Sequence, residues 1–369
     1  MTGEGLTLGD PGVVATRYWR SLPDGRVQCL LCPRECQLRE GQRGLCFVRA
    51  CLGGQVVLTT FGRSSGFCID PIEKKPLNHF LPGTPVLSFG TAGCNLSCHF
   101  CQNWDISRAR RSERLHERAE PELLAAAAKR LGCRSLAYTY NDPVVFLEYA
   151  IATARAARAL GVRSVAVTAG YIHSEPAAEF FQWMDAVNCD LKSFSDTFYR
   201  RLCGGALQPV LETLEYIKHH TGAWLEITTL LIPGENDGDA EIEALSRWVG
   251  ERLGPEVPLH FSAFHPDYRM THLARTPPAT LSRAREIAKR CGLFHVYTGN
   301  VPDVPGQSTC CHGCGGLLIR REGYVLTHWQ LSAAGECLLC GSRCAGVFEG
   351  PPGNWGGRRQ PVSFKGQGE

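Results

Sequence analysis

Cys94, Cys98 and Cys101 follow one another with the spacing C-x3-C-x2-C in the sequence TAGCNLSCHFCQN. Most 4Fe–4S clusters are held by four thiolates, so a compact loop that supplies three leaves one iron open to a further ligand. The alternatives are a zinc knuckle and three incidental thiols. The glycine before Cys94, the aromatic Phe100 before Cys101 and the position directly after a predicted strand favour the cluster. We therefore expect an iron–sulfur cluster with one open iron on this loop.

A second set of thiols lies near the C-terminus, where Cys311-x2-Cys314 is followed after 22 residues by Cys337-x2-Cys340. Two such CxxC pairs present four thiolates in a tetrahedron, which is the pattern of a zinc ribbon. Metal binding there would supply the folding energy that so small a module lacks on its own. The prediction is zinc, and a second iron–sulfur cluster is the alternative.

A third set lies near the N-terminus and consists of Cys29, Cys32, Cys36 and Cys46. Four thiolates at these spacings fit either a structural zinc ion or a fully ligated auxiliary cluster. The residue types favour neither metal, so the sequence leaves both open.

The chain has 369 residues, of which 19 are cysteine, and a formal net charge of +3 at pH 7. This charge is too small to indicate nucleic acid or an anionic membrane as the main partner. No run of about 18 apolar residues predicts a membrane span, and the N-terminal residues lack the pattern of a secretory signal. We therefore expect a cytoplasmic protein with reduced thiols, in which cysteine clusters indicate metal rather than disulfides.

Residues 86–300 repeat one theme, in which a short apolar run and a turn are followed by an amphipathic helix. Such alternation predicts an α/β fold: a partial barrel of parallel strands covered by helices. Polar and glycine residues gather just after these strands, at the edge where such folds place their active sites. The predicted strands are 86–90, 135–140, 164–168, 186–191, 224–232, 258–264 and 293–298.

The distribution of cysteines and apolar runs also predicts how the chain is divided. The barrel domain is expected to be flanked by a Cys-rich metal-binding element on its N-terminal side and a zinc-ribbon-like module on its C-terminal side. The last residues have too little apolar content to fold and are expected to be disordered. The predicted segments are 1–25 (extension), 26–60 (Cys-rich element), 61–306 (barrel), 307–348 (ribbon) and 349–369 (disordered tail).

These segments resemble radical S-adenosylmethionine (SAM) enzymes, in particular those related to pyruvate formate-lyase activating enzyme. The closer resemblance is to the radical SAM member of the AmmeMemoRadiSam system. It is carried by CLLCPRECQLREGQRGLCFVR, DPIEKKPLNHFLPG, LSFGTAGCNLSCHFCQNWDIS, CDLKSFSDTFYRRLCGG and TTLLIPGENDGD. The resemblance implies that SAM binds the open iron held by Cys94, Cys98 and Cys101. One electron would then cleave it to methionine and a 5′-deoxyadenosyl radical, which abstracts hydrogen from a substrate.

The resemblance also implies six residues that contact the cofactor. Phe100 is expected against the adenine, and Asn141 with Asp142 near the methionine amino group, although the family commonly has glutamate at the second position. Asp190 and Lys192 are expected to reach the ribose and the carboxylate. The full set is Phe100, Asn141, Asp142, Asp190, Lys192 and His265.

The expected function is reductive cleavage of SAM followed by hydrogen abstraction from an unidentified substrate. The resemblance implies an electron donor, flavodoxin or ferredoxin, and Memo-like and Ammecr-like proteins as partners. One alternative is an activating enzyme for a glycyl-radical enzyme. An alternative of another class is a non-enzymatic scaffold that uses its metal modules to dock partners.

Overall fold

The computed structural model describes residues 6–109, 115 and 117–364. Its centre is one sheet in which seven neighbouring strands run parallel and follow one another in sequence order. The strands are buried and rich in apolar side chains, as parallel strands covered by helices must be. All seven predicted strands are confirmed: β9 (Pro85–Phe89), β11 (Ser135–Tyr138), β12 (Arg163–Thr168), β13 (Ala186–Asp190), β14 (Trp224–Leu231), β15 (Leu259–Ala263) and β16 (Val296–Gly299).

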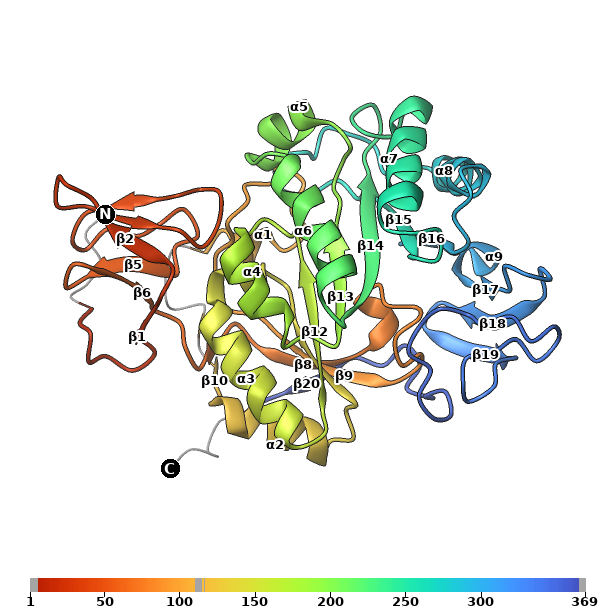
Figure 1. Cartoon of the computed structure of the whole chain (residues 1–369), viewed down its shortest axis with the longest axis horizontal. Helices are drawn as coiled ribbons and strands as arrows, with labels where there is room; N and C mark the ends of the chain where they lie inside the picture. Colours follow the sequence, from red (N-terminus) through yellow and green to blue (C-terminus); the bar gives the residue numbers. More distant parts are fainter. Residues whose placement is uncertain (1–5, 110–114, 116, 365–369) are drawn as a thin grey trace.

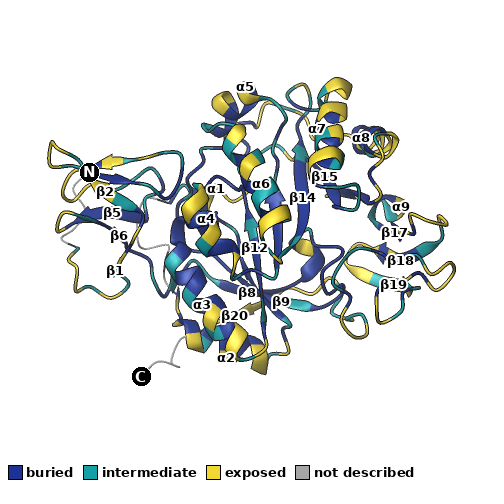
Figure 2. Ribbon diagram, viewed as in Figure 1, coloured by how far each residue is buried: buried dark blue, intermediate teal, exposed yellow. Residues whose placement is uncertain are grey.

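A helix connects each of these strands to the next, so that the helices form the outer layer of the barrel (Figure 1). Figure 2 shows that their exposed residues face outward while the strands beneath are buried. Within the described residues the sheet does not close, since β16 is one edge and a C-terminal strand is the other. The prediction of a partial barrel is therefore confirmed. The helices are α2 (Pro121–Arg130), α3 (Leu147–Ala159), α4 (Ser174–Phe181), α6 (Gln208–His220), α7 (Asp239–Arg252) and α8 (Pro278–Arg290).

Short helical turns lie between strands and these helices. Asp142 caps the turn before α3 by accepting a hydrogen bond from the backbone N–H of Val144 at 3.0 Å. The turns are η1 (Ile72–Lys74), α1 (Trp104–Ser107), η3 (Pro143–Phe146), α5 (Asp196–Phe198), the π-helix η4 (Tyr199–Cys203) and α9 (Val304–Gln307).

Two antiparallel strands extend the sheet beyond β9, namely β8 (Phe67–Pro71) and β20 (Gln360–Val362). The prediction of a disordered tail over 349–369 is wrong for the described part of this segment. Although the tail has few apolar residues, β8 offers it an unpaired edge, and the ring of Phe364 packs on Phe67 with centroids 4.8 Å apart. Residues 365–369 lie outside the described residues.

The Cys-rich element forms two small antiparallel sheets on one side of the barrel (Figure 1). The boundary predicted between residues 25 and 26 falls inside this unit, because strands from both sides of it pair with each other. The buried guanidinium of Arg49 forms an ion pair of 2.6 Å with Glu148 of α3, which ties the unit to the barrel. One sheet contains β1 (Val14–Ala15), β5 (Arg49–Leu52) and β6 (Gln55–Leu58), and the other β2 (Trp19–Ser21), β3 (Val27–Cys29) and β4 (Gln37–Leu38).

The C-terminal module lies at the opposite side of the barrel (Figure 1) and has a small apolar core of its own. Its strands are β17 (Thr309–Cys310), β18 (Leu317–Glu322) and β19 (Val325–Trp329). The buried His79 joins it to the barrel, since its ring nitrogens lie 2.7 Å from the carbonyl oxygen of Ala345 and 2.5 Å from the hydroxyl of Tyr297. A two-stranded ladder of β7 (Arg63–Ser64) and β10 (Glu117–Arg118) completes the fold.

None of the helices in the described residues combines the length and the apolar character needed to cross a membrane.

Candidate functional site

The three cysteines of the C-x3-C-x2-C loop line a cavity of about 720 Å³. Its wall includes residues at the carboxyl ends of β11, β12, β13 and β16, so the cavity opens at the edge of the sheet where the sequence predicts the active site. Its volume is that of a site for a small molecule of cofactor size. The parallel strands thus bring the cysteine loop together with polar residues that are up to about 200 positions away in the sequence, such as Thr298.

The cysteine loop is held in place by backbone hydrogen bonds to the π-helix η4. The N–H of Ser97 donates to the carbonyl oxygen of Cys203 at 2.7 Å, and the N–H of His99 donates to that of Leu202 at 2.9 Å. π-Helical turns are rare and often occur at functional sites. This role of the LCGG segment could not be predicted from the sequence, since a pattern of side chains does not show which carbonyl groups are available.

The three sulfurs are buried or half-buried. Burial raises the pKa of Cys94 and of Cys101, while a hydrogen bond with Cys203 and burial raise that of Cys98. The three thiols do not belong to any group of described residues whose ligand atoms all lie within 4.8 Å of one another. Zn–S bonds of about 2.3 Å would hold the sulfurs of one site about 3.8 Å apart. The wider arrangement fits a larger group, such as a 4Fe–4S cluster, better than a zinc knuckle.

Asn141 follows β11 and holds the approach to Cys94. Its side-chain oxygen accepts a hydrogen bond from the N–H of Thr91 at 2.9 Å. Its side-chain nitrogen donates to the carbonyl oxygens of Ala92 and Gly93 at 3.1 and 2.9 Å. Asn141 lines the cavity, as expected, but its amide is engaged with the loop. Its direct role in the structure is therefore to position the cysteine loop.

Asp142 also lines the cavity and is almost completely buried. Its carboxylate accepts hydrogen bonds from the hydroxyl of Thr168 and the N–H of Ala169, both at 2.9 Å. Burial raises the pKa of this carboxyl group in spite of those donors. Asp142 therefore links the ends of β11 and β12 and presents a carboxylate at the cavity wall.

Lys192 brings a positive charge into the cavity. Its ammonium nitrogen lies 2.8 Å from the carboxylate of Asp190, and both residues line the cavity wall. Burial disfavours the charged form, but the carboxylate of Asp190 raises the pKa of Lys192 above its usual value. The side chain is therefore an ammonium ion held by one counter-ion at the mouth of the barrel.

The structure separates the other two predicted cofactor contacts. Phe100 is buried in the cavity wall, with its ring centroid 5.7 Å from that of Phe198. In contrast, His265 is exposed and does not line the cavity. The backbone N–H of the preceding residue, Phe264, donates to the hydroxyl of Thr276 at 2.9 Å, and its carbonyl oxygen accepts from the N–H of Thr276 at 3.1 Å.

Lys75 is a buried charged residue at the cavity wall, where the sequence left open whether the charged residues of 71–76 line the pocket or form a linker. The ammonium of Lys75 lies 2.7 Å from the carboxylate of Asp70, which also accepts a hydrogen bond from the hydroxyl of Tyr140 at 3.0 Å. Tyr140 has a positive φ of 71°, a strained conformation for a bulky side chain and one that recurs at functional sites. In the segment DPIEKKP, Asp70 lies near the end of β8 and Lys75 follows the turn η1.

The C-terminal module also contributes to the cavity, through Arg321 and Tyr324. The guanidinium of Arg321 is 1% exposed and donates to the carbonyl oxygen of Asn78 at 2.6 Å and to the hydroxyl of Thr309 at 2.8 Å. It also lies 4.0 Å from the buried carboxylate of Glu73. The module is thus part of the cavity wall and not only an appendage.

At the far side of that module, the four sulfurs of Cys311, Cys314, Cys337 and Cys340 all lie within 4.8 Å of one another. The sulfurs of Cys311 and Cys340 are 3.6 Å apart, and those of Cys314 and Cys337 are 3.8 Å apart. These separations are those of four thiolates on one tetrahedral metal ion.

Comparison with known proteins agrees with this geometry. Residues 89–245 match the model of the radical SAM superfamily. The chain is 40% identical over 327 residues to an uncharacterized protein of Methanocaldococcus jannaschii, which covers 88% of this chain and 97% of that protein. It is 30% identical over 115 residues to isethionate sulfite-lyase activating enzyme of Oleidesulfovibrio alaskensis, which covers 30% of this chain and 36% of that enzyme.

Among solved structures, a domain of pyruvate-formate lyase-activating enzyme from Bacteroides vulgatus has 16% identity and a TM-score of 0.40, with 44% of this chain and 98% of that chain covered. Streptococcus suis SuiB bound to precursor peptide SuiA has 14% identity and a TM-score of 0.48, with 62% and 51% covered. The family match spans the cysteine loop and the strands β11 to β14 that surround it. Residues 89–245, which include the cysteine loop, are therefore a radical SAM domain, and the radical SAM superfamily uses a 4Fe–4S cluster and S-adenosylmethionine.

Proposed function

We propose that Cys94, Cys98 and Cys101 hold the 4Fe–4S cluster and that the protein cleaves SAM reductively to abstract hydrogen from a substrate in the cavity. The observation that carries this proposal is the position of the three sulfurs on the wall of the 720 Å³ cavity, at the carboxyl ends of the parallel strands. When bound, the cluster supplies one electron to the sulfonium group of SAM. The protein binds, orients and shields the reacting groups.

Individual residues then have distinct roles. The ammonium of Lys192, held by Asp190, is placed to pair with the carboxylate of SAM. Asp142 presents a buried carboxylate for the amino group of SAM, and Phe100 offers an apolar face for the adenine. Asn141 holds the loop that carries Cys94. The proposal leaves out His265, which does not line the cavity.

We propose that a partner completes the cavity or delivers the substrate, with Memo-like and Ammecr-like proteins as the candidates. Flavodoxin or ferredoxin is the proposed electron donor. Arg321 and Tyr324 of the C-terminal module line the cavity, which supports an active site that includes more than the barrel. A reducing compartment, the cytoplasm, suits a chain in which all 19 cysteines are free. The four C-terminal thiolates are proposed to hold zinc.

Activation of a glycyl-radical enzyme is the second candidate. It is favoured by the likeness to isethionate sulfite-lyase activating enzyme, which covers 30% of this chain. Deuterium transfer into 5′-deoxyadenosine separates the two candidates. Transfer from a glycyl-radical enzyme labelled at its glycine residues supports activation, whereas transfer only in the presence of a Memo-like or Ammecr-like partner supports the first candidate.

The central test is anaerobic reconstitution of the protein and of a variant in which Cys94, Cys98 and Cys101 are all alanine. The reduced wild type is expected to show a paramagnetic signal that changes on addition of SAM, and to form 5′-deoxyadenosine. The triple variant is expected to lose both the SAM-dependent change and the product. Cys133→Ala, which removes a buried thiol outside the cavity, is the control and should behave as the wild type. Product formation by the triple variant would overturn the proposal.

A further inference from the structure

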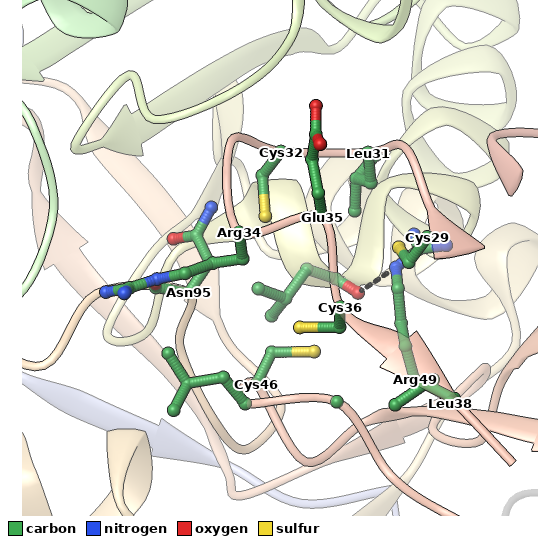
Figure 3. A pocket seen from close by; sticks show the side chains of 13 residues that line it. Cys29, Leu31, Cys32, Arg34, Glu35, Cys36, Leu38, Cys46, Arg49 and Asn95 are labelled. Atoms are coloured by element: carbon green, nitrogen blue, oxygen red, sulfur yellow. Dashed lines mark hydrogen bonds between the residues drawn. The ribbon is translucent and has the colours of Figure 1, made fainter. Parts of the chain in front are cut away.

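The four N-terminal cysteines, Cys29, Cys32, Cys36 and Cys46, surround a small cavity of about 20 Å³. Figure 3 shows the sulfurs of Cys32, Cys36 and Cys46 pointing into the same space, with Cys29 beside it. Cys29, Cys32 and Cys36 come from β3 and the turn that follows it, and the fold adds Cys46 from the segment before β5. The site has the full number of thiolates for either a zinc ion or a cluster.

The separation of the sulfurs distinguishes between these metals. Four thiolates on one zinc ion lie about 3.8 Å apart because each Zn–S bond is about 2.3 Å long. The C-terminal sulfurs satisfy this condition, and all four lie within 4.8 Å of one another. Among the described residues, no three of the N-terminal sulfurs form such a group. Thiolates that bind the four separate irons of a 4Fe–4S cluster stand farther apart than thiolates on one zinc ion, which agrees with the lack of a close group among the described N-terminal sulfurs.

The surroundings also suit an anionic cluster. Leu31, Leu38 and Val145 form an apolar part of the cavity wall. A 4Fe–4S core with four thiolates carries a net negative charge, and the buried guanidinium of Arg49 lines the same cavity. Arg49 is oriented by the carbonyl oxygen of Val145, to which its Nε donates at 3.2 Å, and by its ion pair with Glu148. A cation is thus fixed beside the thiolates.

The N-terminal set lies directly against the C-x3-C-x2-C loop. Asn95 lines the N-terminal cavity, while its neighbour Cys94 lines the cavity of the proposed active site. The Nε of Arg34 donates to the carbonyl oxygen of Asn95 at 2.7 Å. Gly93 has a φ of +73°, and a Cβ at this position would overlap the carbonyl oxygen of Cys46. The backbones of the two cysteine sets are therefore in contact next to their metal-binding residues.

We propose that Cys29, Cys32, Cys36 and Cys46 bind a second 4Fe–4S cluster, which passes single electrons to the cluster at Cys94, Cys98 and Cys101. A reduced one-electron donor of the ferredoxin or flavodoxin class gives one electron to the oxidised second cluster. That electron moves on to the oxidised first cluster, and the second cluster returns to its oxidised state. Each SAM cleaved consumes one electron. The relay step rests on the proposed function, whereas the identity of the second metal site does not.

The first experiment measures iron and zinc per chain in protein purified anaerobically after expression with iron supplied, and records Mössbauer and paramagnetic spectra. Two Cys-ligated clusters predict about eight irons in the wild type. The variant with Cys94, Cys98 and Cys101 replaced by alanine should keep about four irons in a 4Fe–4S cluster whose reduced signal does not respond to SAM. This variant leaves the N-terminal site intact, so it decides the question even where N-terminal variants fail to fold.

The result that overturns the proposal is a triple variant without a cluster that holds about two zinc ions, one for each remaining four-cysteine site. A different result, an unchanged iron content in the triple variant, would instead contradict the proposed function. The two failures are therefore distinguishable. Cys51→Ala serves as the matched control, because this buried thiol belongs to the same unit but does not line the N-terminal cavity, and it should leave the iron content unchanged.

The relay is tested with a double variant, Cys32→Ala with Cys36→Ala, in which the remaining cluster still responds to SAM. Reduction of that cluster by reduced ferredoxin or flavodoxin, followed by stopped-flow absorbance, should be at least about tenfold slower than in the wild type. Dithionite, a small reductant that does not need the docking site, should still reduce it. An unchanged rate with the protein donors would overturn the relay.

Discussion

The side-chain nitrogen of Asn141 donates a hydrogen bond of 2.9 Å to the carbonyl oxygen of Gly93, the residue before Cys94. The same side chain accepts from the N–H of Thr91. One buried amide thus satisfies donors and acceptors along the approach to the cysteine loop, which has no regular secondary structure of its own. The loop is shaped by a residue about 50 positions away, and this arrangement leads to the first prediction.

Asn141→Asp should weaken the cysteine loop. The substitution keeps the shape of the side chain but replaces its N–H donors with an oxygen that faces the carbonyl groups of Ala92 and Gly93. We expect a loss of about 3 kcal/mol in the free energy of unfolding and a lower yield of the SAM-responsive cluster on reconstitution. Asn354→Asp makes the same change at an exposed position and should have little effect on either measurement. Equal cluster yields for the two variants would contradict this prediction.

Arg321→Met should destabilise the junction between the C-terminal module and the barrel. Without the guanidinium, the buried carboxylate of Glu73 loses the cation beside it, and three backbone or hydroxyl acceptors lose their donor. Breaking such a buried pair costs about 3–5 kcal/mol, which urea unfolding measures.

The neighbouring Arg320→Met is the matched control for this change. Arg320 is in the same strand but its ion pair with Glu322 is largely exposed, so its removal should cost less than about 1 kcal/mol. Adding Glu73→Gln to Arg321→Met should recover part of the loss, because no uncompensated charge then remains buried. No recovery would show that the effect comes from packing instead.

Lys192→Met should weaken the binding of SAM to the reconstituted protein. The substitution removes the ammonium that Asp190 holds at the cavity wall and leaves a side chain of similar length. Loss of this pairing should raise the Kd for SAM at least about tenfold, which corresponds to about 1.4 kcal/mol. Anaerobic equilibrium dialysis measures this change. Lys218→Met removes an ammonium from a similar ion pair with Glu256, outside the cavity, and should leave the Kd unchanged.

His295 should make the stability of the protein depend on pH. Burial lowers its pKa to about 4, so it is neutral in the folded protein at pH values where an unfolded histidine, with a pKa of about 6.5, takes up a proton. The contribution of the neutral His295 to the free energy of unfolding is complete above about pH 6.5 and is lost as the pH falls towards 4. His295→Phe removes the titrating group at a position where Nε2 has no hydrogen-bond partner among the described residues.

Between pH 8 and pH 5, the free energy of unfolding should therefore fall by about 2 kcal/mol less in His295→Phe than in the wild type. Urea unfolding at the two pH values measures the difference. His328→Phe is the control, because His328 is exposed, and its pH dependence should equal that of the wild type. An equal fall in His295→Phe would show that other groups control the acid sensitivity.

Several features could be predicted from the sequence because they depend on neighbouring residues. The seven parallel strands follow from short apolar runs, each bounded by turns and followed by an amphipathic helix. Cys94, Cys98 and Cys101 lie within eight positions of one another, so a single loop is enough to bring them to one site. The ribbon could also be predicted, since each CxxC pair is local and only one hairpin separates the two pairs.

Other features depend on contacts between distant segments, and only the tertiary structure decided them. The pairing of β20 with β8 depends on an edge created nearly 300 residues earlier. Asn141 lines the cavity, but its hydrogen bonds are directed at the loop, and His265 is exposed and does not line the cavity. Arg321 enters the cavity wall because the C-terminal module folds back onto residues 73–78. The order of residue types cannot show these contacts, since hydrogen bonding and burial depend on which surfaces meet.

The three cysteine sets show which features the sequence determines and which depend on the tertiary structure. The sequence by itself determined that three groups of thiolates occur and that one group has only three members. It left the metal of the N-terminal group undecided, because the same four residues can bind zinc or a cluster. The tertiary structure sets the distances between sulfurs: close contact in the C-terminal ribbon and a wider arrangement around Cys32, Cys36 and Cys46. Metal preference follows from that distance, which is fixed by how the strands pack and not by the spacing of cysteines along the chain.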